Sequence, residues 1–244
     1  MIFAATALGG EGSDLREAPT LIVGVESYDY APYYTSENGN YSGFCRDVLD
    51  LFAARMGYKL TIRAHPYLRL VVELIKGDID VEFPDDIDWL PEKKAGHDFQ
   101  YSNKVLNYVD GVARLSADLG KPIGTLKVIA MPRGWWPADY LPLAKQGLLR
   151  IEEEPSVEAT AKSLLSGHVD GVYLSEDVVE YFFRSIHREG EAHLDRSLPY
   201  KTGSYHMSTI RHPEAIADFN RFLENSQTEI AALRAKYRIG DSLP

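Results

Sequence analysis

Apolar and polar residues follow one another along the chain in blocks that predict alternating strands and helices. Residues 21–25 form a continuous apolar run of strand length, which is typical of a strand buried on both faces. Residues 44–56 carry apolar side chains at helical spacing, and Gly57 ends the pattern. Strand-like and helix-like patterns then alternate as far as residue 237, which predicts an α/β fold with mixed, mostly parallel sheets. The further predicted strands are residues 59–64, 79–83, 108–115, 125–131, 149–152 and 169–174, and the further predicted helices are residues 68–76, 138–146, 156–166, 177–186, 213–224 and 227–237.

A short phrase occurs twice and divides the chain into two similar parts. An apolar helical run ends at Gly77 and again at Gly167, and each glycine precedes a short strand that carries an aspartate, Asp80 or Asp170. Glycine fits the left-handed backbone conformation that often ends a helix. The two copies lie about ninety residues apart, which suits two α/β lobes rather than a solenoid. Two lobes predict a cleft between them, where a small ligand is most often held.

Charge and cysteine content narrow the choice of partner. The 244 residues include 36 acidic and 26 basic side chains, giving a formal net charge of −10. Nucleic acids and anionic membranes bind basic surfaces, so neither is an expected partner. Cys45 is the single cysteine, which excludes an internal disulfide and a cysteine-cluster metal site.

Several short motifs occur in a recognisable order along the chain. They are the aromatic loop Tyr30-Ala31-Pro32-Tyr33, Gly43-Phe44 before a helix, the two glycine–aspartate phrases, Asp98-Phe99 with Tyr101-Ser102, and the closing Ser208 and His212-Pro213-Glu214. In order and spacing these motifs resemble the type II periplasmic solute-binding proteins, specifically the family 3 branch typified by polar amino acid receptors. The resemblance covers roughly residues 20–240.

The resemblance implies two lobes that are joined by two crossing strands and close on a ligand by a hinge motion. Lobe 1 is expected at about residues 20–104 and 203–244, lobe 2 at about 105–202, and the crossings near 102–107 and 199–205. Residues 1–20 are expected to be a disordered lead or the remnant of a secretion signal, truncated or removed. The implied protein is a periplasmic monomer that presents a small polar ligand to the membrane subunits of an ABC transporter.

The chain departs from the amino acid receptors at three positions that the resemblance maps onto ligand contacts. Where those receptors use an arginine for the ligand carboxylate, the nearest residue here is Lys94, which lacks the planar two-point grip of arginine. Where they use an aspartate for the ligand ammonium, Leu174 stands near the expected place, and Glu176 or Asp177 could substitute or could simply cap a helix. Cys45 replaces a further acid. We therefore expect a ligand other than a standard α-amino acid.

The remaining candidates for the cleft are aromatic and acidic. Ligands in open α/β sheets lie beyond the carboxyl ends of strands, where this sequence places two aromatic loops and an acidic turn. Such a set suits a cationic or amphipathic ligand, held by cation–π contact and ion pairing. About half of the aromatic residues are expected to face the cleft and the others to pack the loops. The candidates are Tyr28, Tyr30, Tyr33, Asp85, Asp86, Trp135 and Trp136.

A Pro-aromatic-x-Arg element, residues 66–69, resembles a less characterised branch of the same family and adds Tyr67 and Arg69 to the candidates. Arg133 could face them from the second lobe. Each arginine could bind an anion or form a surface ion pair.

Other chemistry finds little support in the sequence. The histidines lack the spacing of metal ligands, and Asp85-Asp86-x-Asp88 lacks the glycine and distal glutamate of a calcium loop. No phosphate loop, dinucleotide fingerprint or Gly-x-Ser-x-Gly motif is present, and no cofactor is expected. A transport receptor is the leading hypothesis and a periplasmic sensory module of the same fold is the alternative. A dehydratase-like enzyme would have to rely on Glu82, Asp85 or Asp86.

Overall fold

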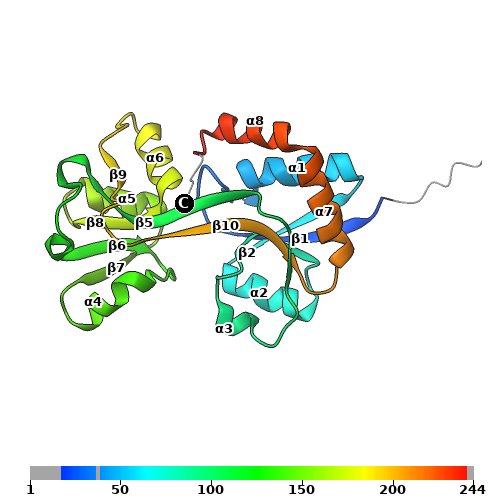
Figure 1. Cartoon of the computed structure of the whole chain (residues 1–244), viewed down its shortest axis with the longest axis horizontal. Coiled ribbons are helices and arrows are strands. Elements are labelled where there is room, and N and C mark those ends of the chain that lie inside the picture. Colours follow the sequence, from blue (N-terminus) through cyan, green and yellow to red (C-terminus); the bar gives the residue numbers. More distant parts are fainter. Residues whose placement is uncertain (1–17, 37–38, 241–244) are drawn as a thin grey trace, which may run out of the picture.

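A computed structural model describes residues 18–36 and 39–240, and it forms one strand path in which helices flank the sheets (Figure 1). The strand order is β2-β1-β3-β10-β5-β8-β6-β7, with β4 paired to β10 and β9 paired to β5. The strands are β1 (Thr20–Glu26), β2 (Lys59–His65), β3 (Val81–Asp85), β4 (Gln100–Tyr101), β5 (Leu106–Leu115), β6 (Val128–Pro132), β7 (Arg150–Glu154), β8 (Gly171–Ser175), β9 (Ala192–Leu194) and β10 (Tyr200–Thr209). The helices are α1 (Phe44–Met56), α2 (Tyr67–Lys76), α3 (Pro91–Lys94), α4 (Leu141–Lys145), α5 (Val157–Leu165), α6 (Glu176–Ser185), α7 (Pro213–Asn225) and α8 (Gln227–Tyr237).

The two ends of the strand path repeat one arrangement. At one end, β1 pairs in parallel with β2 and β3, and at the other end β6 pairs in parallel with β7 and β8. Figure 1 shows α2 and α3 with the first group and α4, α5 and α6 with the second. Each group is a strand–helix–strand unit whose apolar strands are covered by helices, as the alternating pattern predicts.

The long strands β5 and β10 run between the two groups and pair with each other along residues 106–111 and 200–205 (Figure 1). They overlap the predicted crossings near 102–107 and 199–205. The prediction of mixed sheets is confirmed, although four of the nine strand pairings among residues 18–36 and 39–240 are parallel and five are antiparallel. The five antiparallel pairings all involve β5 or β10, because these two strands return the chain between the groups.

The repeated glycine–aspartate phrase has the same structure in both groups. Gly77 (φ 83°) and Gly167 (φ 68°) both adopt the left-handed conformation expected after a helix. Asp80 accepts a hydrogen bond from the backbone N–H of Ile22 at 2.7 Å, and Asp170 accepts from Lys127 and Val128 at 2.7 and 2.9 Å. Each aspartate therefore ties its own strand to the start of the neighbouring parallel strand.

Some elements differ from the sequence prediction for local reasons. The strand predicted from residue 79 begins at Val81, and Ile79, just before it, packs with Leu70 and Leu74 in a small apolar cluster. The helix predicted at 138–146 is a 3₁₀ turn followed by α4. Pro142, near the start of α4, has no N–H to donate to a carbonyl of the preceding turn, so the two segments do not form one continuous α-helix. The short strands β4 and β9 carry too few residues for a periodic signal.

The predicted lead at residues 1–20 lies almost entirely outside the described residues. Within the part of the chain that the structure describes, no helix has both the length and the hydropathy needed to cross a membrane.

Candidate functional site

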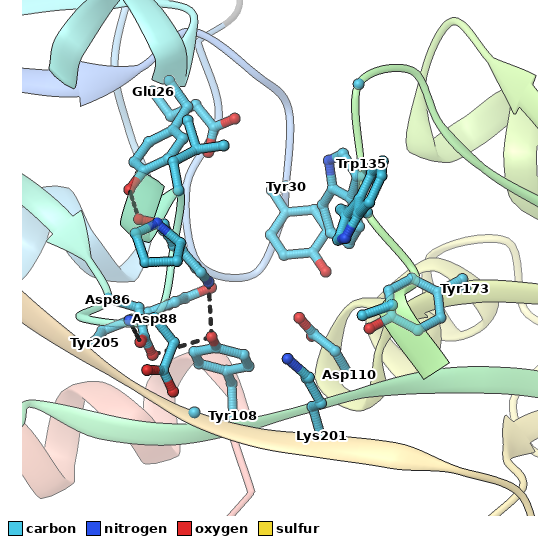
Figure 2. A pocket seen from close by; sticks show the side chains of 18 of the residues that line it. Glu26, Tyr30, Asp86, Asp88, Tyr108, Asp110, Trp135, Tyr173, Lys201 and Tyr205 are labelled. Atoms are coloured by element: carbon cyan, nitrogen blue, oxygen red, sulfur yellow. Dashed lines mark hydrogen bonds between the residues drawn. The ribbon is translucent and has the colours of Figure 1, made fainter. Parts of the chain in front are cut away.

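A cavity of about 610 Å³ lies between the two groups, at the carboxyl ends of β1, β3 and β6 (Figure 2). The crossing strands β5 and β10 contribute its floor. Its volume falls within the range of pockets that hold small organic ligands. Aromatic and acidic side chains dominate the lining, which consists of Glu26, Tyr30, Tyr34, Tyr67, Asp86, Asp88, Trp89, Leu90, Pro91, Glu92, Tyr108, Asp110, Gly134, Trp135, Trp136, Ala138, Tyr173, Lys201, Thr202, Gly203 and Tyr205.

Three rings from separate segments form one side of the cavity. Tyr30 comes from the loop after β1, Trp135 from the loop after β6, and Tyr173 from β8. The Tyr30 and Trp135 rings meet edge to face with centroids 5.0 Å apart, and the Trp135 and Tyr173 rings are 6.4 Å apart. The Tyr30 hydroxyl also accepts a hydrogen bond from the backbone N–H of Ser175 at 2.9 Å, which fixes this ring.

Two further rings form the opposite side and are held by hydrogen bonds. The indole N–H of Trp89 donates to the Tyr108 hydroxyl at 2.9 Å, and that hydroxyl donates to Oδ2 of Asp86 at 3.0 Å. Asp86 also accepts from the backbone N–H groups of Ser204 and Asp88. Three protein donors thus bind the buried Asp86 carboxylate, so its main contribution to the cavity is its charge.

Acidic groups outnumber basic groups in the lining. Five carboxyl side chains (Glu26, Asp86, Asp88, Glu92 and Asp110) face a single amine, that of Lys201. Burial raises the pKa of Asp110 to about 7, an effect that Asp86 increases while Ser175 and Lys201 oppose it. Burial also raises the pKa of Glu26, although the hydrogen bond from Tyr34 opposes the change. A cation that enters the cavity would stabilise the ionised form of both acids.

A buried ion pair supports the wall from behind. The Lys94 ammonium donates to Oδ1 of Asp85 at 2.8 Å and to the backbone oxygen of Asp86 at 2.7 Å. The hydroxyl of Tyr67, whose ring lines the cavity, also donates to Asp85. The nearby Glu82 carboxyl is fully buried, and its burial raises its pKa well above the ordinary value. Lys94 is thus occupied by protein groups and does not present its charge to the cavity.

Five of the thirteen predicted ligand contacts lie in the cavity lining: Tyr30, Tyr67, Asp86, Trp135 and Trp136. They all follow strand ends or begin the helix after a strand, where the sequence places ligand contacts in α/β sheets. Trp136, which also belongs to the lining, is 74% exposed and therefore stands at the rim. Whether these residues touch a ligand stays a prediction.

Four other predicted contacts lie outside the lining: Tyr33, Asp85 and Asp177 are buried, and Tyr28 is partly buried. Tyr28 packs against the main apolar core. The Tyr33 hydroxyl donates to Asp177 at 2.7 Å, and Asp177 also accepts from the backbone of Gly240. Asp85 is directed to Lys94 and Tyr67. The polar groups of Tyr33, Asp85 and Asp177 therefore find their partners within the protein, which the sequence alone does not reveal.

The last four predicted contacts also lie outside the lining. One of them, Lys94, is buried in its ion pair with Asp85, and the other three form part of the surface. Arg69 pairs with Glu73 one helical turn along α2, at 2.7 Å. Glu176 accepts from Arg196 at 2.5 Å. Arg133 is exposed. Arg69 thus forms the surface ion pair that was its alternative, and neither arginine belongs to the cavity lining.

Sequence reasoning missed the contribution of the crossing strands. Tyr108 and Asp110 lie on β5, and Lys201 and Tyr205 lie on β10. No local motif marks these positions, because each belongs to a strand rather than to a loop after one. The available signal was Asp110 itself, a lone carboxylate within the apolar run of residues 108–115.

Within the described residues, no group of three or more histidine, cysteine, aspartate or glutamate side chains is placed to hold a metal ion. Cys45 is buried and unbonded to sulfur.

Comparison with known proteins identifies the family of this chain. The sequence model of the bacterial extracellular solute-binding proteins, family 3, matches residues 21–238. The chain belongs to this family. Its fold is that of the type II periplasmic binding proteins. A search of curated proteins found no match to the sequence.

Several solved structures share this fold over most of their length. The GluR0 ligand-binding core in complex with L-glutamate has a TM-score of 0.70 and 15% identity, covering 91% of this chain and 99% of that chain. A histidine kinase sensor domain has a TM-score of 0.70 and 20% identity, covering 94% and 100%. A mutant of ArgBP from T. maritima has a TM-score of 0.67 and 18% identity, covering 91% and 96%. At these identities, the likeness establishes the shared fold alone.

Proposed function

We propose that the protein is an extracytoplasmic receptor that captures a small organic cation in this cavity and delivers it to an ABC transporter. The observation that carries the proposal is the lining, in which five carboxyl groups and nine aromatic rings face one lysine. Aromatic faces attract cations through their quadrupole, and carboxylates add charge at short range. An anionic ligand would find a single partner and several repulsive neighbours there.

The amino acid ligands of the family fit this lining less well. The lining contains no arginine, and Lys94 is bound to Asp85 and Asp86. A ligand carboxylate would therefore depend on Lys201, which lies beside Asp110 in the β5–β10 register. This arrangement favours an amine without an α-carboxylate.

Hinge closure is part of the proposal. The predicted lobes, residues 20–104 with 203–244 and residues 105–202, would rotate about β5 and β10 as the ligand enters. Closing excludes water from the cavity, which strengthens every polar contact with the ligand. The closed form would be the shape that a transporter recognises. We expect a periplasmic monomer without catalytic turnover.

A thermal-shift screen of purified protein tests the ligand class. The compounds are primary amines, quaternary amines, α-amino acids and organic acids, matched for carbon number. A cation at a hundred times its dissociation constant should stabilise the protein by about 2.7 kcal/mol. Stabilisation by organic acids or by α-amino acids alone would contradict the proposed ligand class, and chemical conversion of a bound compound would contradict a receptor role.

A sensory module is the second candidate, and similarity to a histidine kinase sensor domain over 94% of this chain favours it. The two roles differ in their cellular effect. Deletion of a transport receptor removes high-affinity uptake of the ligand. Deletion of a sensor leaves uptake intact and removes a ligand-dependent response.

A further inference from the structure

Two of the five acids in the cavity lining, Asp110 and Asp88, lie in different places. In Figure 2, Asp110 lies with Tyr173 and Trp135 toward one side, whereas Asp88 lies beside Asp86 and Tyr108 toward the other. Asp110 belongs to β5, and Asp88 belongs to the segment after β3. Each acid therefore has its own group of rings, and the cavity holds two similar environments rather than one.

The first environment centres on Asp110. Its strand position is opposite Ser175 of β8 and opposite Lys201 of β10. Figure 2 shows the Asp110 carboxylate pointing toward Tyr30, whose ring packs against Trp135. Lys201 is exposed, and its effect on the pKa of Asp110 is smaller than the effects of burial and of Asp86. No hydrogen bond or ion pair joins Lys201 to Asp110 among the described residues, so the Asp110 carboxylate is available to a cationic group of a ligand.

The second environment centres on Asp88. Its backbone N–H donates to Asp86, and its carboxylate is exposed, with no hydrogen bond or ion pair to the side chain among the residues that the structure describes. Trp89 lies edge to face with Tyr67 at 5.3 Å and 6.0 Å from Tyr108, so its ring is held in place. A free carboxylate beside fixed rings is suited to a second ammonium group.

From these two environments we infer that the ligand is a dication, an α,ω-diamine or a longer polyamine, with one ammonium group at Asp110 and the other at Asp88. This inference rests on the proposed function, because it assigns a charge pattern to the same cation. The apolar chain between the amines would lie against the aromatic rings. A single ammonium group would fill only a part of the 610 Å³ cavity and would leave one acid without a partner.

Calorimetric titration of the full chain with three probes of equal carbon number tests the inference. The probes are pentane-1,5-diamine, pentylamine and the zwitterion 5-aminopentanoate. The diamine should bind at least about tenfold tighter than pentylamine, which corresponds to about 1.4 kcal/mol. Asp110→Asn and Asp88→Asn should each weaken diamine binding by about tenfold and bring it close to that of pentylamine. Asp50→Asn, which makes the same charge change on the surface of α1, should leave binding unchanged.

Each contrary result has a distinct meaning. Equal affinity for pentylamine and the diamine would overturn the inference that the ligand is a dication, and would leave the proposed cation receptor intact. Tighter binding of 5-aminopentanoate would overturn it by assigning Lys201 to a ligand carboxylate. If neither amine binds and an organic acid does, the proposed function itself is wrong. A circular dichroism melt of each variant shows that it is folded, so a loss of affinity reports on the site.

Discussion

At the scale of single residues, buried acids govern both the stability and the site of this protein. Glu82 on β3 is fully buried, and neither oxygen of its carboxyl has a hydrogen-bond partner among the described residues. Burial raises its pKa well above 4.5, and the neighbouring Asp85 adds to the effect. The folded protein therefore holds this carboxyl neutral, whereas the unfolded chain ionises it at neutral pH. Below the ordinary pKa both states hold the carboxyl neutral, so its burial has no electrostatic cost to folding. As the pH rises toward the raised pKa, only the unfolded chain ionises it, so the free energy of unfolding falls.

Glu82→Gln removes this loss, because glutamine has nearly the same shape and stays neutral in both states. As the pH rises, the variant should therefore become more stable relative to the wild type. The difference in the free energy of unfolding should grow by about 1.4 kcal/mol for each pH unit between the ordinary and the raised pKa of Glu82. Urea unfolding at about pH 5 and about pH 7 measures it. An effect of equal size at both pH values would show that Glu82 is ionised in the folded protein.

The two adjacent tryptophans provide a matched pair of variants. Trp135 packs between Tyr30 and Tyr173, whereas Trp136 is 74% exposed at the rim. Trp135→Ala should weaken binding of a cationic ligand by at least about tenfold, because a cation–π contact and the wall of the cavity are lost together. Trp136→Ala should change the affinity by no more than about threefold. Equal losses in calorimetric titration would place both rings on the ligand.

At the scale of elements, the periodic pattern of the sequence predicts most strands and helices. Strand ends also predict Tyr30, Asp86 and Trp135 at the cavity, because the carboxyl ends of parallel strands meet at one edge. The pattern could not assign Asp110, Lys201 or Tyr205, since these residues lie on β5 and β10, whose place in the sheet depends on pairing across ninety residues. The pattern also could not show whether Lys94 contacts a ligand or, as the structure has it, forms a buried ion pair with Asp85.

The repeated aspartates make a prediction about how the elements are held together. Asp170 accepts two backbone hydrogen bonds at the start of β6 and is not part of the cavity lining. Asp170→Asn should lower the free energy of unfolding by about 1–2 kcal/mol, because bonds to a charged acceptor are lost or weakened. Urea unfolding measures this loss, and calorimetric titration should show unchanged ligand affinity. A large loss of affinity would contradict a purely structural role.

At the scale of the whole molecule, the two groups of elements touch through the loop after β1. The Tyr33 hydroxyl donates to Asp177 at 2.7 Å and lies 3.3 Å from the Ser175 hydroxyl, while Tyr30 accepts from the backbone of Ser175. Ser175 is also the strand partner of Asp110. The contacts that join the two groups are therefore continuous with the cavity, so closure and ligand binding should depend on each other.

Tyr33→Phe tests this dependence. The variant loses a hydrogen bond to a carboxylate that exists only when the two groups are together, so closure becomes less favourable. Ligand affinity should fall by about tenfold, in keeping with about 1.5 kcal/mol for such a bond. Small-angle scattering should show a larger radius of gyration for the unliganded variant than for the wild type, and ligand should reduce the difference. Unchanged scattering and affinity would contradict a closing contact.

The central claim is that the cavity selects a small organic cation by charge. Calorimetric titration of the wild-type protein with pentane-1,5-diamine and with pentanedioate compares two ligands of equal carbon number and opposite charge. We expect saturable binding of the diamine at one site and no measurable heat of binding for pentanedioate. Saturable binding of pentanedioate, with none for the diamine, would contradict the claim.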